Sequence, residues 1–192
     1  MIKTFSSRAG RLSPTNISFL EKKSNCVLGL EETPDTKKPI VIDIGFGDAQ
    51  SFVKDVLANK DYCFIGIEPY KKGFARAVEF YEKNKPSNLF LFNGDAREYI
   101  DSAKCMISFI RIHFPDPWPK KKHIKRRLIS KEFLYFIHSK TKKGCKIEII
   151  TDSKIYQDHI KDLLATQKIF EITNNFETVS YTHLTLPTTS KV

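Results

Sequence analysis

Short apolar blocks alternate with longer amphipathic stretches along most of this chain. Residues 40–44 form a nearly continuous β-branched run, which is typical of a parallel strand buried on both faces. The next stretch, residues 51–59, places its apolar residues at helical spacing. The same criteria predict four more strands and three more helices: strands over 62–67, 88–92, 106–114 and 145–151, and helices over 73–84, 96–102 and 127–141. This alternation predicts an α/β fold, a doubly wound parallel sheet with helices on both faces.

A carboxylate lies at or just beyond the end of each predicted strand. The five in chain order are Asp43, Glu68, Asp95, Asp116 and Asp152. The carboxyl ends of parallel strands meet at one edge of a sheet, where open α/β sheets bind their ligands. The sequence therefore predicts a binding site at this edge. The alternative is ordinary turn chemistry, because Asp is favoured in turns and helix caps.

The positive charge of the chain is concentrated in one segment. The 192 residues contain 32 Lys and Arg against 22 Asp and Glu, a net charge of +10. Residues 111–146 hold twelve of the basic residues and two of the acidic ones, so the rest of the chain is balanced. This distribution predicts a polyanionic partner bound at a defined place, although a solvated lysine-rich helix would give the same count.

Several protein classes are excluded by simpler features. No apolar run approaches the about 20 residues of a membrane span, and the N-terminus lacks the apolar core of a secretory signal. The four cysteines are widely spaced, which argues against a disulfide scaffold or a zinc site. We therefore expect a cytoplasmic protein without a metal ion or membrane contact, either a monomer or a homodimer.

The glycine turn after the first strand favours a methyl donor over a dinucleotide. A dinucleotide fingerprint requires a third glycine where this chain has Gln50, and no phosphate-loop lysine follows. Gly45 and Gly47 allow close approach of the backbone, and Asp43 suits a cationic ligand. Glu68 is placed for ribose hydroxyls, and Asp95 for an adenine amino group. Together they indicate S-adenosylmethionine; the alternative is a turn residue and a helix cap in another α/β protein.

The stretch FPDPWPKKKHIKRR, residues 114–127, carries the substrate prediction. Prolines on both sides of Asp116 restrict the backbone and present its carboxylate with little freedom. Trp118 could stack on a base or could be a core residue. The basic run that follows predicts phosphate contacts by Lys121, Lys122, Arg126 and Arg127.

These motifs resemble the bacterial single-subunit tRNA (guanine-N7)-methyltransferases. The resemblance rests on Ile44-Gly45-Phe46-Gly47, Gly66-Ile67-Glu68, Asp95-Ala96 and above all FPDPWPKKKHIKRR. It implies a class I methyltransferase with a Rossmann-like sheet that methylates a guanosine in the tRNA variable loop. By the same resemblance S-adenosylmethionine binds at Asp43, Glu68, Asp95 and Asp116. Asp116 is then the catalytic residue, and Lys120 and Asp152 lie on the substrate side.

The chain departs from the family at three places. Asp43 stands where a glutamate is usual, and Ala49 replaces a third glycine of the turn. The tail, residues 179–192, is rich in Thr and poor in charge, which suggests that the natural C-terminal strands are truncated or replaced, leaving an unpaired sheet edge. The expected organisation is a basic arm and lead-in helix over 1–30, a methyltransferase domain over 31–178 and a non-native tail over 179–192.

Two other functions are compatible with these features. One is a methyltransferase that uses S-adenosylmethionine on another nucleic acid or on a protein. The other is an RNA-binding relic whose catalysis is impaired by the altered C-terminus.

Overall fold

A computed structural model describes residues 2–5, 10–167, 169–170 and 182–187. The chain divides into two compact units, each described by itself. The N-terminal unit covers residues 7–106, and the C-terminal unit covers residues 107–192 together with 1–6. The expected arm around residues 6–9 and the predicted boundary at 178/179 lie outside the described residues.

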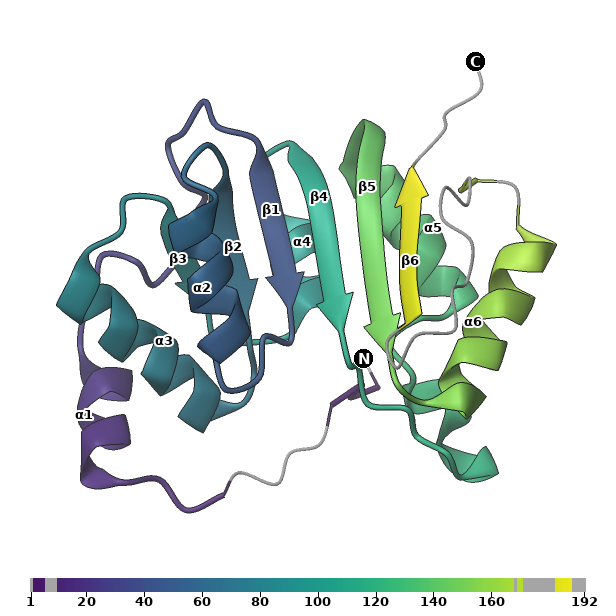
Figure 1. Cartoon of the computed structure of the whole chain (residues 1–192), viewed down its shortest axis with the longest axis horizontal. Coiled ribbons are helices and arrows are strands. Elements are labelled where there is room, and N and C mark those ends of the chain that lie inside the picture. The colour runs from purple at the N-terminus through teal and green to yellow at the C-terminus, as the bar shows by residue number, and fades with distance from the viewer. Residues whose placement is uncertain (1, 6–9, 168, 171–181, 188–192) are drawn as a thin grey trace. The chain divides into compact units, whose positions relative to one another are not determined.

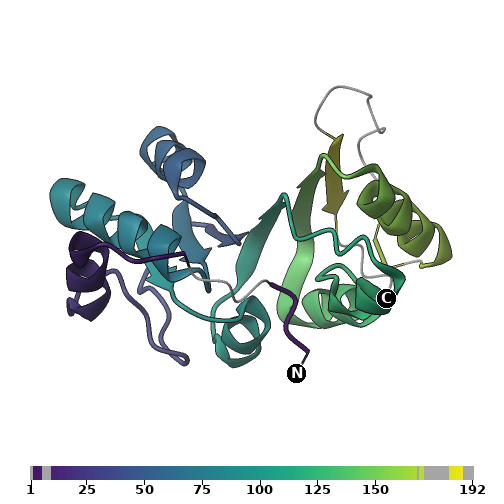
Figure 2. The ribbon, with the colours of Figure 1, turned by 90° about the horizontal axis from the view of Figure 1, so that it is seen from below.

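The N-terminal unit is a three-stranded parallel sheet with helices on both faces. Strands β1 (Ile40–Ile44), β2 (Cys63–Ile67) and β3 (Leu89–Phe92) pair in the order β3-β2-β1. Figures 1 and 2 show helices α2 and α4 on opposite faces of this sheet. The four helices are α1 (Pro14–Glu21), α2 (Gln50–Ala58), α3 (Lys71–Asn84) and α4 (Ala96–Ser102).

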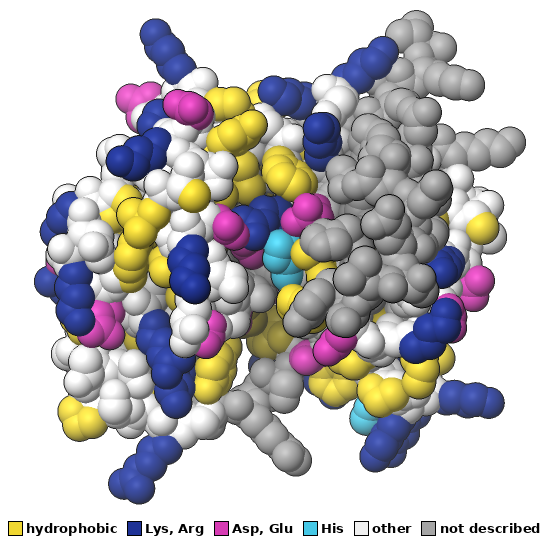
Figure 3. Space-filling model, in the orientation of Figure 1, with side chains coloured by type: hydrophobic (Ala, Val, Ile, Leu, Met, Phe, Trp, Pro, Cys, Tyr) yellow, Lys and Arg dark blue, Asp and Glu magenta, His cyan; other side chains and the backbone are white. Residues whose placement is uncertain are grey.

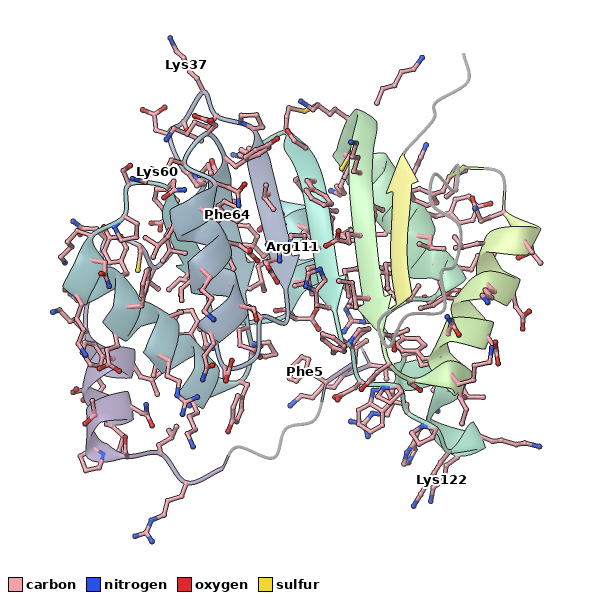
Figure 4. All side chains as sticks on the ribbon, in the orientation of Figure 1. Phe5, Lys37, Lys60, Phe64, Arg111 and Lys122 are labelled. Atoms are coloured by element: carbon pink, nitrogen blue, oxygen red, sulfur yellow. The ribbon has the colours of Figure 1, made fainter. Side chains whose placement is uncertain are left out.

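The core of this unit lies on both sides of the strands. Every residue of β1 and β2 is buried, as the continuous apolar runs predict. Phe64 of β2 meets the ring of Phe52 from α2 edge to face, with ring centroids 6.3 Å apart (Figure 4). The α/β class expected from the sequence is thereby confirmed.

The C-terminal unit is built on strands β4, β5 and β6. The parallel pair is β4 (Ile107–His113) and β5 (Thr141–Thr151), and β6 (Thr182–Pro187) pairs antiparallel with β5. Helices α5 (Lys131–Lys140) and α6 (Lys154–Thr166) pack against β5, and a 3-10 helix, η1 (Lys121–Arg126), follows the β4 loop. None of the helices among the described residues is long and apolar enough to cross a membrane.

Three features of this unit differ from the sequence expectation. The helix predicted from residue 127 begins at Lys131, because the Ser130 hydroxyl caps it by accepting from Phe133 N at 3.2 Å. Helix α6 was not predicted. The expectation of an unpaired edge is wrong for this structure, since Lys146–Thr151 of β5 pair with β6. The origin of residues 179–192 stays a prediction.

Candidate functional site

The glycine turn after β1 is held in place by Glu68. Gly45 and Gly47 have φ angles of 76° and 63°, in the left-handed region that favours glycine. The Gly47 amide donates to Glu68 Oε2 at 2.7 Å, and the Tyr70 amide donates to Glu68 Oε1 at 2.8 Å. Glu68 is only 5% exposed, so its buried carboxylate connects the turn to the start of α3 through these two hydrogen bonds.

Gly73 of helix α3 packs closely against the same turn. A Cβ on Gly73 of α3 would lie 1.7 Å from the carbonyl oxygen of Gly47. The helix can therefore approach the turn only because position 73 has no side chain. The role of Gly73 cannot be recognised from the sequence, since the close approach depends on tertiary distance and not on a local pattern.

The three carboxylates of the N-terminal unit lie at one edge of its sheet. Asp43 is in β1, Glu68 directly follows β2, and Asp95 follows β3, and all three strands are parallel. Asp43 is buried, with 3% of its surface exposed. The prediction that parallel strands would collect these groups is confirmed within this unit.

Asp95 has local partners as well. It caps α4 by accepting from Arg97 N at 2.9 Å, and its two oxygens also accept from the Arg97 guanidinium at 2.9 and 2.5 Å. Burial works against ionisation, but these hydrogen bonds and the Arg97 charge outweigh it and hold the pKa of Asp95 below its usual value. The helix-cap interpretation therefore describes Asp95 in this structure, and a contact with adenine stays a prediction.

The turn fits the methyl donor that the sequence indicates. A Cβ on Gly45 or Gly47 would have no heavy atom within 4 Å, so the backbone here borders open space. A buried carboxylate, Asp43, lies in the strand that leads into it. Ala49, which replaces the third glycine of the family, has a φ angle of 70° at the start of α2, in the left-handed region that a glycine would favour. Backbone open to a ligand beside a buried carboxylate suits a cationic amino acid moiety.

The C-terminal unit presents Asp116 on a strained loop. Phe114 and Trp118, two residues to either side, have φ angles of 50° and 42°. Such conformations in residues other than glycine are uncommon and cluster at functional sites. The Phe114 amide donates to Ile150 O at 2.8 Å, which fixes the loop where it leaves β4. Asp116 itself is exposed.

Asp152 lies at the same edge as Asp116. It directly follows β5, which is parallel to β4. Asp152 is also exposed. The predicted collection of strand-end carboxylates is therefore confirmed within each unit. That the two sets form one site stays a prediction.

The basic run after the loop divides into exposed and buried members. Lys120, Lys121, Lys122 and Lys125 are exposed, and Lys122 extends away from the ribbon (Figure 4). Basic side chains gather over η1 at the lower right of Figure 3. Arg127 differs, because it is only 5% exposed.

Trp118 and Arg126 are in contact with each other and with the N-terminal segment. The Arg126 guanidinium lies 3.7 Å from the centroid of the Trp118 ring. Trp118 Nε1 donates to Thr4 O at 3.0 Å, and Arg126 Nε donates to Lys3 O at 3.3 Å. A base that stacks on Trp118 would therefore share the ring with a guanidinium, or displace it.

The C-terminal unit carries almost all of the net positive charge of the chain. The C-terminal unit contains 17 Lys and Arg against 8 Asp and Glu, a formal charge of +9. The N-terminal unit contains 15 against 14, a formal charge of +1. Among the described residues there is no group of three His, Cys, Asp or Glu side chains that could hold a metal ion.

Solved structures of methyltransferases share this fold. An rRNA methylase from Streptococcus thermophilus superposes with a TM-score of 0.60 at 11% identity, over 80% of this chain and 88% of the other. A "putative methyltransferase from Streptococcus mutans in complex with SAH" gives a TM-score of 0.55 at 11% identity, over 80% and 90%. At this identity the likeness shows the fold alone, a class I Rossmann-like methyltransferase fold.

Sequence comparison identifies the family. Residues 37–191 match a family model described as "Putative methyltransferase". The tRNA (guanine-N(7)-)-methyltransferase of Wolbachia pipientis is 38% identical over 80% of this chain and 71% of that protein. The enzyme of the same name from Buchnera aphidicola is 33% identical over 91% and 79%. With its glycine turn, its strand-end carboxylates and these relatives, the chain belongs to the tRNA (guanine-N7)-methyltransferase family.

Proposed function

We propose that this protein transfers a methyl group from S-adenosylmethionine to N7 of a guanosine in tRNA, in the variable loop. The observation that carries the proposal is the β4 loop, where the exposed Asp116 is followed at once by the exposed cations of η1. A carboxylate beside a phosphate-binding surface is what a reaction on a nucleotide within a polyanion needs. Since tRNA is the substrate, we also propose a cytoplasmic location.

The donor would be held by the N-terminal unit. Asp43 would attract its cationic end, and the open backbone of Gly45 and Gly47 would border it. Each Glu68 oxygen accepts a backbone amide, and its carboxylate is the kind of acceptor that a ribose hydroxyl needs. Asp95 could turn toward an adenine amino group only by sharing its oxygens with Arg97. The sulfonium of the donor supplies an electrophilic methyl group.

Asp116 would orient the guanine base without acting as an obligatory general base. Guanine N7 carries an in-plane lone pair and no proton, so nothing must be removed before it attacks. The carboxylate can accept from the guanine N1–H and amino group, and it can oppose the positive charge that develops on the purine. Orientation of this kind supplies a large part of a rate enhancement.

The tRNA backbone would lie along the exposed cations. Lys120, Lys121, Lys122 and the half-buried Arg126 would contact phosphates, and Asp152 lies at the same strand edge as Asp116. A matched lysine pair, Lys142 and Lys143, is equally exposed but lies on β5 before its pairing with the carboxyl-terminal part of β4. Lys142 and Lys143 therefore lie near the amino-terminal end of β4, whereas η1 follows the loop at its carboxyl end, and the seven residues of β4 span about 20 Å.

The test is methyl transfer from labelled S-adenosylmethionine to total RNA and protein, followed by separation of the products. We expect label in tRNA; label in rRNA or protein alone would instead support the alternative methyltransferases. Binding of donor and tRNA without turnover would support the RNA-binding relic.

The lysine pairs supply a matched comparison for the tRNA surface. Changing Lys121 and Lys122 together to Ala should weaken tRNA binding and reduce the salt slope by about 2, whereas changing Lys142 and Lys143 should leave both close to the wild type. Equal effects of the two double variants would contradict a defined tRNA surface at η1.

A further inference from the structure

Arg127 is a buried cation in a basic run whose lysines are all exposed. Its side chain is withdrawn from the surface, and its Nε donates to the carbonyl oxygen of Pro117 at 2.9 Å. Because α5 begins only at Lys131, the backbone at Arg127 is extended and turns the side chain away from the course of η1. Arg127 therefore differs from its neighbours in both burial and partner.

The loop that contains Pro117 has few ways to hold its own shape. Pro115, Pro117 and Pro119 have no backbone N–H, so they cannot donate hydrogen bonds within the loop. Phe114 and Trp118 are in left-handed conformations, which persist only where the surroundings fix them. The loop therefore depends on anchors from outside, and Arg127 contacts the carbonyl of the residue directly after Asp116.

Arg127 is in turn fixed by helix α6. Its guanidinium lies 5.4 Å from the centroid of the Tyr156 ring, and Tyr156 is fully buried. The Tyr156 hydroxyl accepts from Ile129 N at 3.0 Å, and His159 Nε2 lies 3.0 Å from Ile129 O. Two α6 side chains thus hold the short extended segment that carries Arg127.

Asp116 also interacts electrostatically with this cluster. Burial is the main cause that raises the pKa of Tyr156, and the Asp116 charge raises it further, while the Ile129 hydrogen bond and the Arg127 charge oppose the rise. The hydroxyl stays neutral at physiological pH, so it serves as a hydrogen-bond acceptor and not as a charge.

We infer that Arg127 is a positioning residue for methyl transfer, and not a tRNA phosphate contact. It holds the Pro117 carbonyl and thereby the direction in which Asp116 is presented. The inference rests on the proposed function, because it assigns Asp116 to the methylated base. It revises the role that the basic run alone predicts for Arg127.

The experiment compares Arg127→Met with Lys125→Met, a change at an exposed cation of the same run. Met keeps an unbranched apolar stem but removes the guanidinium. We expect Arg127→Met to lower kcat about 100-fold, as a misplacement of about 1 Å does, with unchanged tRNA affinity and salt slope. Lys125→Met should instead weaken tRNA binding and reduce the salt slope by about 0.9.

Trp118 provides a readout that does not depend on activity. It is the only tryptophan in the chain and directly follows Pro117. Its emission should shift in Arg127→Met, because the loop loses its anchor, and should stay unchanged in Lys125→Met. If the wild type fails to methylate tRNA, the proposed function fails, whereas this emission shift still tests whether Arg127 holds the loop.

The remaining outcomes also decide the question. A weaker tRNA affinity with a smaller salt slope and an unchanged kcat would overturn the inference, and so would wild-type behaviour in every assay. If Arg127→Met does not fold, Arg127→Lys replaces it, because this variant keeps the positive charge but lacks the planar guanidinium group. We then expect a lower kcat at unchanged tRNA affinity, because Lys cannot reproduce the guanidinium geometry; full activity of Arg127→Lys would contradict the inference.

Discussion

Replacing Gly73 with Ala tests whether the approach of α3 to the glycine turn holds the donor site together. The new methyl carbon would lie 1.7 Å from Gly47 O, and a tolerated contact needs at least 3.0 Å, so the helix and the turn must separate by 1.3 Å. Gly47 N is bonded to Glu68 at 2.7 Å, and a shift of that size would lengthen or break this bond.

The free energy of unfolding follows from three opposed effects. Overpacking costs about 1–3 kcal/mol, and losing a hydrogen bond to a charged group costs about 1.5–3 kcal/mol. The better helix propensity of Ala returns about 1 kcal/mol. We expect a net destabilisation of about 2–4 kcal/mol, since the two costs exceed the gain.

The assay is urea denaturation together with calorimetric titration of S-adenosylmethionine. The variant should have a lower urea midpoint and bind the donor at least 10-fold more weakly. Gly10→Ala is the matched control, because its methyl group would lie 3.4 Å from the Tyr70 hydroxyl, an ordinary contact. Wild-type stability and donor affinity in Gly73→Ala would show that the approach of α3 does not hold the turn.

Two further predictions concern stability and thiol reactivity. The hydrogen bonds from Lys22 and Lys85 lower the pKa of Glu82 from 4.5 to about 2, so their stabilisation is present above pH 4.5 and is lost as the pH falls toward 2. The urea midpoint of Glu82→Gln should therefore lie below that of the wild type at pH 7 and converge with it near pH 2; a constant difference would contradict this. Burial raises the pKa of the buried thiols of Cys26, Cys63 and Cys145 to about 11. Iodoacetamide at pH 8 should therefore modify these thiols slowly in the folded protein and rapidly in urea. Fast labelling of the folded protein would show that the thiols are accessible.

The strands and their terminal carboxylates could be predicted because each depends on local pattern. Ile40–Ile44 and Cys63–Ile67 are buried on both faces, and continuous apolar runs carry that information directly. Once the strands are parallel, Glu68 and Asp95 must follow their ends at one edge. Fold class and edge position are therefore consequences of periodicity.

The supporting contacts could not be predicted in the same way. A run of six cations gives no sign that Arg127 is buried, because its burial follows from the cap at Ser130 and the ring of Tyr156. Helix α6 has a local signal as well, since Tyr156, Ile160 and Leu164 recur at helical spacing. The role of Asp95 could not be decided from the sequence for a different reason. Its partner Arg97 is only two residues away, but the same local sequence permits either a ligand contact or a helix cap.

The most direct measurement is the position of methylation in tRNA after incubation with S-adenosylmethionine. Methylation of N7 leaves a positively charged purine that is sensitive to reduction and strand cleavage, so the modified nucleotide can be located by primer extension. We expect N7-methylguanosine in the variable loop with the wild type, and at least 100-fold less with Asp116→Ala at unchanged stability. A methylated tRNA without N7-methylguanosine, or full activity of Asp116→Ala, would contradict this expectation.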